Sequence, residues 1–101
     1  MKLKRIKKLR VNNSIFDVVW DSKYHGAGFD YSKLSLTIST DVSDSVMFMY
    51  LCHELWEVCA IEMGVRLNRP DCLTDYIFVY DHRQHTTMCE MFTGFITQFI
   101  K

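Results

Sequence analysis

The sequence predicts an α+β fold, in which a small, mainly antiparallel twisted sheet packs on a long central helix and a second helix ends the chain. Three features predict it. Apolar and polar side chains alternate in two places within residues 3–39, nothing interrupts a helix over residues 45–63, and residues 88–99 carry an apolar stripe at spacings of three and four. Because there is no internal repeat, low-complexity stretch or linker, we expect residues 1–101 to form a single domain.

Two strand regions are expected before the long helix. Residues 3–20 are typical of a β-hairpin, because the Asn12-Asn13 pair can adopt the positive φ that a tight turn needs. The chain breaks at residues 25–28, which contain two glycines. Residues 34–39 then alternate apolar and polar side chains, the pattern of a strand with one buried face.

Two helices are expected in the rest of the chain. Ser43 is an N-cap candidate for the helix over residues 45–63, and a glycine directly after that segment offers a left-handed stop. A short β-like run follows at residues 76–80. Asp81 and Gln84 then resemble a capping box, which opens a second helix that runs nearly to the end of the chain.

Charge is distributed unevenly along the chain. Twelve basic and twelve acidic residues cancel, which argues against a nucleic-acid binder that depends on a positive field over its whole surface. Half of the basic residues nevertheless lie within residues 2–10. A short lysine-rich edge strand that resists aggregation has this composition, and we favour that interpretation. Contact with nucleic acid through the same segment is the alternative.

The composition also limits the class of protein and its location. With 49% hydrophobic and 24% charged residues, the chain has the composition of a folded domain, which excludes disorder. No apolar run approaches the ~18 residues of a membrane span, and the N-terminus lacks the apolar core of a signal peptide. The four cysteines form no CxxC pair, so we expect them to be reduced and the protein to be cytoplasmic.

The predicted long helix carries a polar patch. It is apolar around almost its whole circumference, yet it contains His53, Glu54 and Glu57 on one side. Burying an unpaired carboxylate costs several kcal/mol, so the two glutamates indicate a cleft, a basic partner or a bound cation. The arginines beyond residue 10 are all expected in or near loops: Arg66, Arg69 and Arg83. Histidines are therefore left as the partners of the two glutamates.

His85 is the best placed of these histidines. It lies close to the centre of the apolar stripe of the second helix, so we expect it to face inward. His53 and Glu57, four residues apart, project from the same face, and imidazole nitrogen and carboxylate oxygen both bind zinc at about 2.0 to 2.2 Å. This pattern predicts a metal site with His53, Glu57 and His85 as ligands, and with Glu54 as the base that takes a proton from water.

The segment His53-Glu54-Leu55-Trp56-Glu57 resembles a variant of the His-Glu-x-x-His helix of zincin metallopeptidases. With strands before it and a histidine on the following helix, most of the chain is similar to small zincin-like metallopeptidases of phages and prophages, distant relatives of the ImmA/IrrE group. The resemblance implies a minimal zincin-like fold in which the long central helix is the active-site helix. It also implies a phage-encoded protein in the cytoplasm of a bacterial host.

The same resemblance assigns roles to residues. It implies zinc bound by His53, Glu57 and His85, with Glu54 as the catalytic residue. The strand at residues 34–39 would be the edge along which a peptide substrate lies, with Ser35 and Thr37 as substrate-binding residues. Because two histidines and one carboxylate also match the facial triad of non-haem iron, iron or another divalent metal is left open.

Two functions remain in competition. The first is hydrolysis of a peptide bond by metal-activated water. The second is a non-enzymatic protein of the same fold, with or without the metal, that occludes a host or phage protein as a counter-defence inhibitor does. The partner is a protein or peptide in both cases. A purely structural alternative also exists, in which the two glutamates lie on a solvent-facing strip and His53 is a satisfied, semi-buried histidine.

Overall fold

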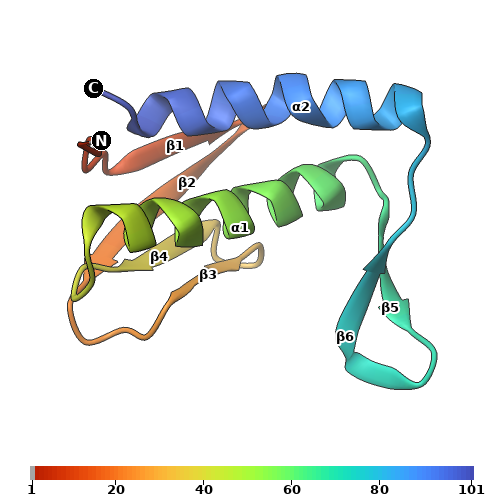
Figure 1. Ribbon diagram of the computed structural model, residues 1–101, viewed down its shortest axis with the longest axis horizontal. Coiled ribbons are helices and arrows are strands. Elements are labelled where there is room, and N and C mark those ends of the chain that lie inside the picture. Colours follow the sequence, from red (N-terminus) through yellow and green to blue (C-terminus); the bar gives the residue numbers. More distant parts are fainter. Residues whose placement is uncertain (1) are drawn as a thin grey trace.

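A four-stranded sheet and two helices on one of its faces make up the body of the protein (Figure 1). The computed structural model describes residues 2–101, with the side chains of residues 73 and 74 left out. The architecture is therefore α+β with a mostly antiparallel sheet and two helices, which confirms that part of the predicted fold.

The sheet has the order β1-β2-β4-β3. Its strands are β1 (Lys8–Val11), β2 (Ser14–Asp21), β3 (Ala27–Asp30) and β4 (Ser35–Ser39). β1 pairs with β2, and β3 with β4, in antiparallel fashion, whereas the central pair β2 and β4 is parallel. The two edges of the sheet are consequently β1 and β3.

The first hairpin and the last strand of the sheet agree with the predictions. Asn12 adopts φ +53°, which closes the tight turn between β1 and β2. β3 was not predicted, because the glycines on either side of Ala27 indicated a break. Gly26 does turn the chain with φ +79°, but the backbone then extends and pairs with β4.

The two helices form where capping signals predict them. α1 (Asp44–Glu62) begins after Ser43, whose Oγ accepts a hydrogen bond from the Val46 amide, and it ends before Gly64 at φ +71°. α2 (His82–Ile96) opens with a complete capping box and continues into the 3₁₀ turn η1 (Thr97–Phe99). Neither helix combines the length and apolar character that a membrane span requires in the part of the chain that the structure describes.

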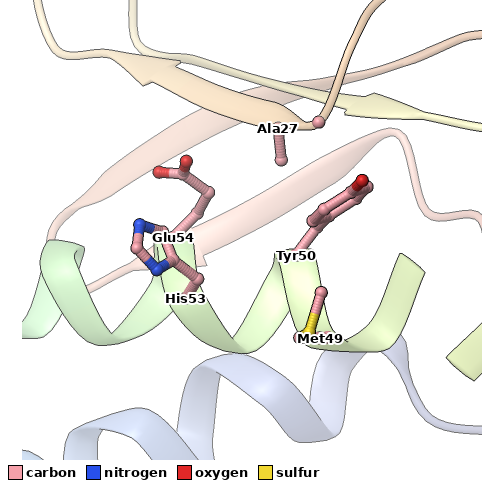
Figure 2. A pocket seen from close by; sticks show the side chains of 6 residues that line it. Ala27, Met49, Tyr50, His53 and Glu54 are labelled. Atoms are coloured by element: carbon pink, nitrogen blue, oxygen red, sulfur yellow. The ribbon is translucent and has the colours of Figure 1, made fainter. Parts of the chain in front are cut away.

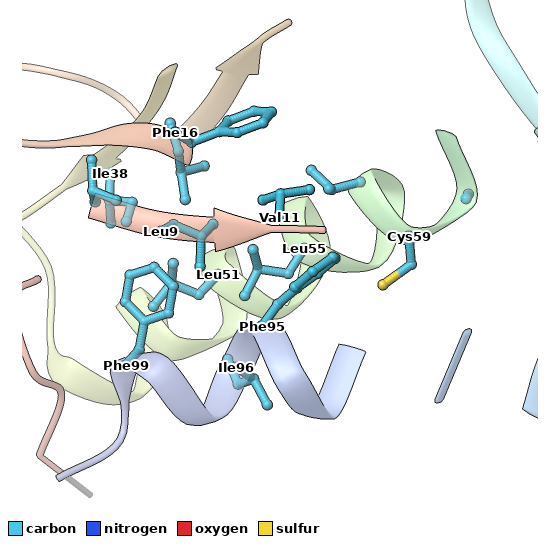
Figure 3. Packing of buried hydrophobic residues seen from close by; sticks show 14 of the residues in the cluster. Leu9, Val11, Phe16, Ile38, Leu51, Leu55, Cys59, Phe95, Ile96 and Phe99 are labelled. Atoms are coloured by element: carbon cyan, nitrogen blue, oxygen red, sulfur yellow. The ribbon is translucent and has the colours of Figure 1, made fainter. Parts of the chain in front are cut away.

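The hydrophobic core lies between the sheet and the helices. α1 lies against β3 and β4 on one side and against α2 on the other (Figure 1), while α2 also covers β1. Figure 3 shows strand, α1 and α2 side chains meeting in this core. Full burial of each such side chain is worth about 1.5 to 3 kcal/mol. Its largest fully buried members include Leu9, Phe16, Leu36, Ile38, Met47, Leu51, Leu55, Met88 and Phe99.

A second, two-stranded sheet stands beyond the C-terminal end of α1 (Figure 1). It is an antiparallel hairpin of β5 (Arg66–Arg69) and β6 (Cys72–Phe78). The β-like run at residues 76–80 predicted part of β6, but β5 was expected to be a loop. Several large apolar side chains on and after this hairpin are exposed: Leu67, Ile77, Phe78, Val79 and Tyr80.

The two edges of the main sheet differ. Gln98 closes the β1 edge, because its Oε1 accepts from the Arg10 amide at 2.9 Å and its Nε2 donates to the Arg10 carbonyl at 3.0 Å. β1, which contains part of the basic segment, lies at an edge of the sheet as expected. Among the described residues, no strand pairs with the outer side of β3. β3 is therefore the open edge.

Candidate metal centre

Three potential metal ligands gather on α1. His53, Glu54 and Glu57 each offer one ligand atom, and these atoms all lie within 4.8 Å of one another. The group exists because residues one turn apart share a helix face and Glu54 flanks them. It could hold a metal ion, and no second such group occurs among the described residues.

Two members of the group, His53 and Glu54, line a pocket beside the open sheet edge. The pocket has a volume of about 350 Å³ and is lined by Gly26, Ala27, Met49, Tyr50, His53 and Glu54. Figure 2 shows Glu54 pointing from α1 toward the strand that carries Ala27, with His53 beside it. Ala27 faces the helix because it pairs with Ile38, which is fully buried in the core. A ligand in this pocket would touch both β3 and the carboxylate of Glu54.

Glu57 is held at both of its carboxylate oxygens. His53 Nε2 lies 2.9 Å from Oε2, and Arg66 Nη1 donates to Oε1 at 3.2 Å. The Glu57 and Arg66 side chains are only 17% and 18% exposed, whereas His53 is 69% exposed. The expectation that no arginine reaches the polar patch is therefore wrong. β5 is a strand rather than a loop, and it brings Arg66 alongside the end of α1.

Glu54 differs from Glu57 in its surroundings. The pKa of Glu54 is raised to about 7, mainly by burial and also by the neighbouring Glu57 carboxylate, while His53 and Arg66 act in the opposite direction. A carboxyl group whose pKa lies near neutrality can both accept and return a proton at physiological pH. Its position in the pocket and its protonation behaviour suit a general base.

His85 is not part of the group that the structure brings together. It is exposed, so the expectation that it faces inward is wrong. Its ring lies 6.2 Å from that of Trp56, stacks at 6.0 Å on Tyr80, and has Nε2 3.6 Å from the Cys89 sulfur. Met88, which is fully buried, takes the core-facing position in this part of α2 instead.

Ser35 and Thr37 do not lie on an edge strand, so the expectation that their strand forms the sheet edge is wrong. β4 is an interior strand, with β2 on one side and β3 on the other. The alternation along β4 places Leu36 and Ile38 toward the helices, which directs Ser35 and Thr37 to the opposite face. The strand beside the pocket is β3, which the sequence did not reveal as a strand.

Two features of the site were missed from the sequence: β3 and Arg66. A signal for the second was present, since Arg69-Pro70-Asp71 separates two segments of suitable length for a hairpin. Arg66 would then have been placed on a strand that follows α1 directly. That placement would have supplied the basic partner that Glu57 needs.

The donor set fits a borderline divalent ion. One imidazole nitrogen and carboxylate oxygens are ligands that zinc and non-haem iron accept. The neighbouring guanidinium adds a positive charge, but it occupies only the oxygen of Glu57 that faces away from His53. No protein-family model, curated protein or solved structure matches this chain.

Proposed function

We propose that this protein is a zinc-dependent peptide hydrolase with a minimal zincin-like arrangement. One observation carries the proposal: His53, Glu54 and Glu57 lie together on α1, and His53 and Glu54 line a pocket beside the edge strand β3. An open edge strand can bind an extended peptide through main-chain hydrogen bonds. The proposal thus joins a peptide-binding edge to a set of residues suited to hydrolysis.

Each residue of the site has a role in this proposal. His53 and Glu57 would hold the metal ion, which when bound polarises a carbonyl group and acidifies water. Glu54 accepts the proton of the attacking water and returns it to the leaving amine. β3 holds the substrate backbone, and the pocket lined by Ala27 and Met49 accepts one of its side chains.

The decisive experiment separates Glu54 from the residues that hold the ion. Purified protein is loaded with zinc and assayed on a mixture of fluorogenic peptides, in parallel with Glu54→Gln. We expect Glu54→Gln to retain the zinc and to lose hydrolysis by about 10²- to 10⁴-fold, because general base catalysis contributes that much. Glu90→Gln, an exposed carboxylate on α2, is the control and should remain active. Equal hydrolysis by Glu54→Gln and wild type would refute the proposal.

A specific observation favours the second candidate, a non-enzymatic binding protein. The hairpin β5–β6 and the residues after it expose five large apolar side chains, which is typical of surfaces that contact other proteins. If zinc-loaded protein hydrolyses no peptide, a binding function through this hairpin or the open edge β3 becomes the better explanation. A charged substitution such as Ile77→Lys would then abolish the biological effect, while Glu54→Gln would not.

A further inference from the structure

Arg66 reaches the candidate metal centre on α1 from the two-stranded sheet. It is the first residue of β5, in the hairpin that follows α1, and its Nη1 donates to Glu57 Oε1 at 3.2 Å. Both side chains are less than one-fifth exposed, so this is a mostly buried ion pair. Removing one partner of such a pair leaves the other charge poorly solvated.

Two aromatic rings fix the position of the Arg66 guanidinium. Its central carbon lies 3.7 Å from the ring centroid of Tyr76 on β6 and 5.6 Å from that of Phe29 on β3. Stacking on an aromatic face stabilises a cation and restricts the orientation of the planar guanidinium. Arg66 is consequently held by both sheets while it contacts α1.

This arrangement leaves a single oxygen of Glu57 directed at the site. Oε1 is held by Arg66, and Oε2 lies 2.9 Å from His53 Nε2. Two ligand atoms that bind one tetrahedral zinc at 2.0 to 2.2 Å lie about 3.3 to 3.5 Å apart. A separation change of about half an ångström would therefore suffice for Oε2 and Nε2 to share an ion.

We infer that Arg66 is a positioning residue that holds Glu57 as a one-oxygen metal ligand, an inference that rests on the proposed function. Two effects of Arg66 on zinc binding oppose each other. Orienting Glu57 favours binding, whereas the positive charge beside a ligand carboxylate repels the metal ion. The guanidinium charge is delocalised, stacked on Tyr76 and paired with Oε1, whereas the carboxylate would otherwise turn freely. Orientation is therefore the larger effect, as it is for hydrogen-bonding partners of metal ligands generally.

The test measures zinc affinity rather than hydrolysis. Dissociation constants are determined at pH 7 by competition with a chromophoric chelator for wild type, Arg66→Gln, Arg66→Lys and Arg69→Gln. We expect Arg66→Gln to bind zinc about 10- to 100-fold more weakly, the loss typical of such partners. Arg66→Lys should lose less, because it keeps the charge but not the planar fork. Arg69→Gln, in the same hairpin but paired with Asp71 and Asp75, should bind like wild type.

The outcomes separate this inference from the proposed function. Wild type that binds no zinc overturns both. Wild type that binds zinc, with Arg66→Gln binding equally or more tightly, overturns the positioning role of Arg66 alone. Thermal unfolding of each variant verifies that it is folded. If Arg66→Gln does not fold, Arg66→Lys decides: affinity equal to that of wild type overturns the inference, and several-fold weaker binding supports it.

Discussion

Glu54 carries an unfavourable charge in the metal-free protein. Its pKa is raised from 4.5 to about 7, mainly because the side chain is partly buried. The folded state therefore binds the proton more tightly than the unfolded state does. The contribution of protonated Glu54 to the stability of the fold is complete below about pH 4.5 and is lost as the pH rises to about 7.

Glu54→Gln should consequently stabilise the metal-free protein at pH 8 and not at pH 4.5. We expect a gain of about 1 to 2 kcal/mol in the free energy of unfolding at pH 8, after allowance for partial exposure of the carboxylate. Urea unfolding in the presence of a chelator at both pH values measures it. Glu90→Gln, which removes an exposed carboxylate, should show no such difference. A gain that is the same at both pH values would contradict the assigned cause.

Among the site residues, those on one helix could be predicted and those that depend on other elements could not. The spacing of His53 and Glu57 alone places them on one face, since helix geometry is local. The surroundings of His85 and Arg66 depend instead on how α2 and the hairpin β5–β6 pack against α1. An apolar stripe indicates which side of a helix is buried but does not decide which of two neighbouring positions faces the core. In this part of α2, Met88 faces the core and His85 does not.

At the level of elements, β3 would limit which substrates the pocket admits if the protein hydrolyses peptides as proposed. Ala27 lies in the pocket, opposite Met49 and Glu54, so a larger side chain there would fill it (Figure 2). Ala27→Leu should lower kcat/KM for peptide hydrolysis by about tenfold or more, since contacts of this size are worth 1 to 3 kcal/mol. Its zinc affinity should remain that of wild type, because Ala27 contributes no ligand atom.

The matched control for this change is Val19→Leu. Val19 is exposed and lies on the face of the sheet that is turned away from the helices, so its enlargement leaves the pocket intact. Steady-state kinetics on the same peptide mixture gives the comparison. Unchanged kcat/KM in Ala27→Leu would place the substrate elsewhere.

Local signals account for the elements that could be predicted. The Asn12 turn, the Ser43 cap and the Asp81–Gln84 capping box each act within a few residues, so their consequences are visible in the sequence. β3 has no such signal, since it is short and becomes a strand only by pairing with a later segment. For β5 the signal was the Arg69-Pro70-Asp71 turn that follows it. The pairing of β3 with β4 also makes β4 an interior strand. Because β3 was not predicted, β4 was wrongly expected to be the edge.

For the whole molecule, α1 links the sheet, α2 and the hairpin, so an ion bound on α1 should stabilise the entire fold. A ligand that binds only the folded state stabilises it by about 2.7 kcal/mol at one hundred times its dissociation constant. For a domain of about 100 residues, each kcal/mol raises Tm by about 4 to 8 °C. We therefore expect saturating zinc to raise the Tm of wild type by roughly 10 to 20 °C, and a chelator to reverse the change.

Single substitutions show which side chains carry this stabilisation. His53→Ala and Glu57→Ala should each remove the rise in Tm, because these two residues would hold the ion. His85→Ala should keep the rise, since His85 lies outside that group and contacts Trp56 and Tyr80 instead. Loss of the zinc effect in His85→Ala would mean that the first turns of α2 move toward α1 when the ion binds. The three-ligand site predicted from the sequence would then form only in the metal-bound protein.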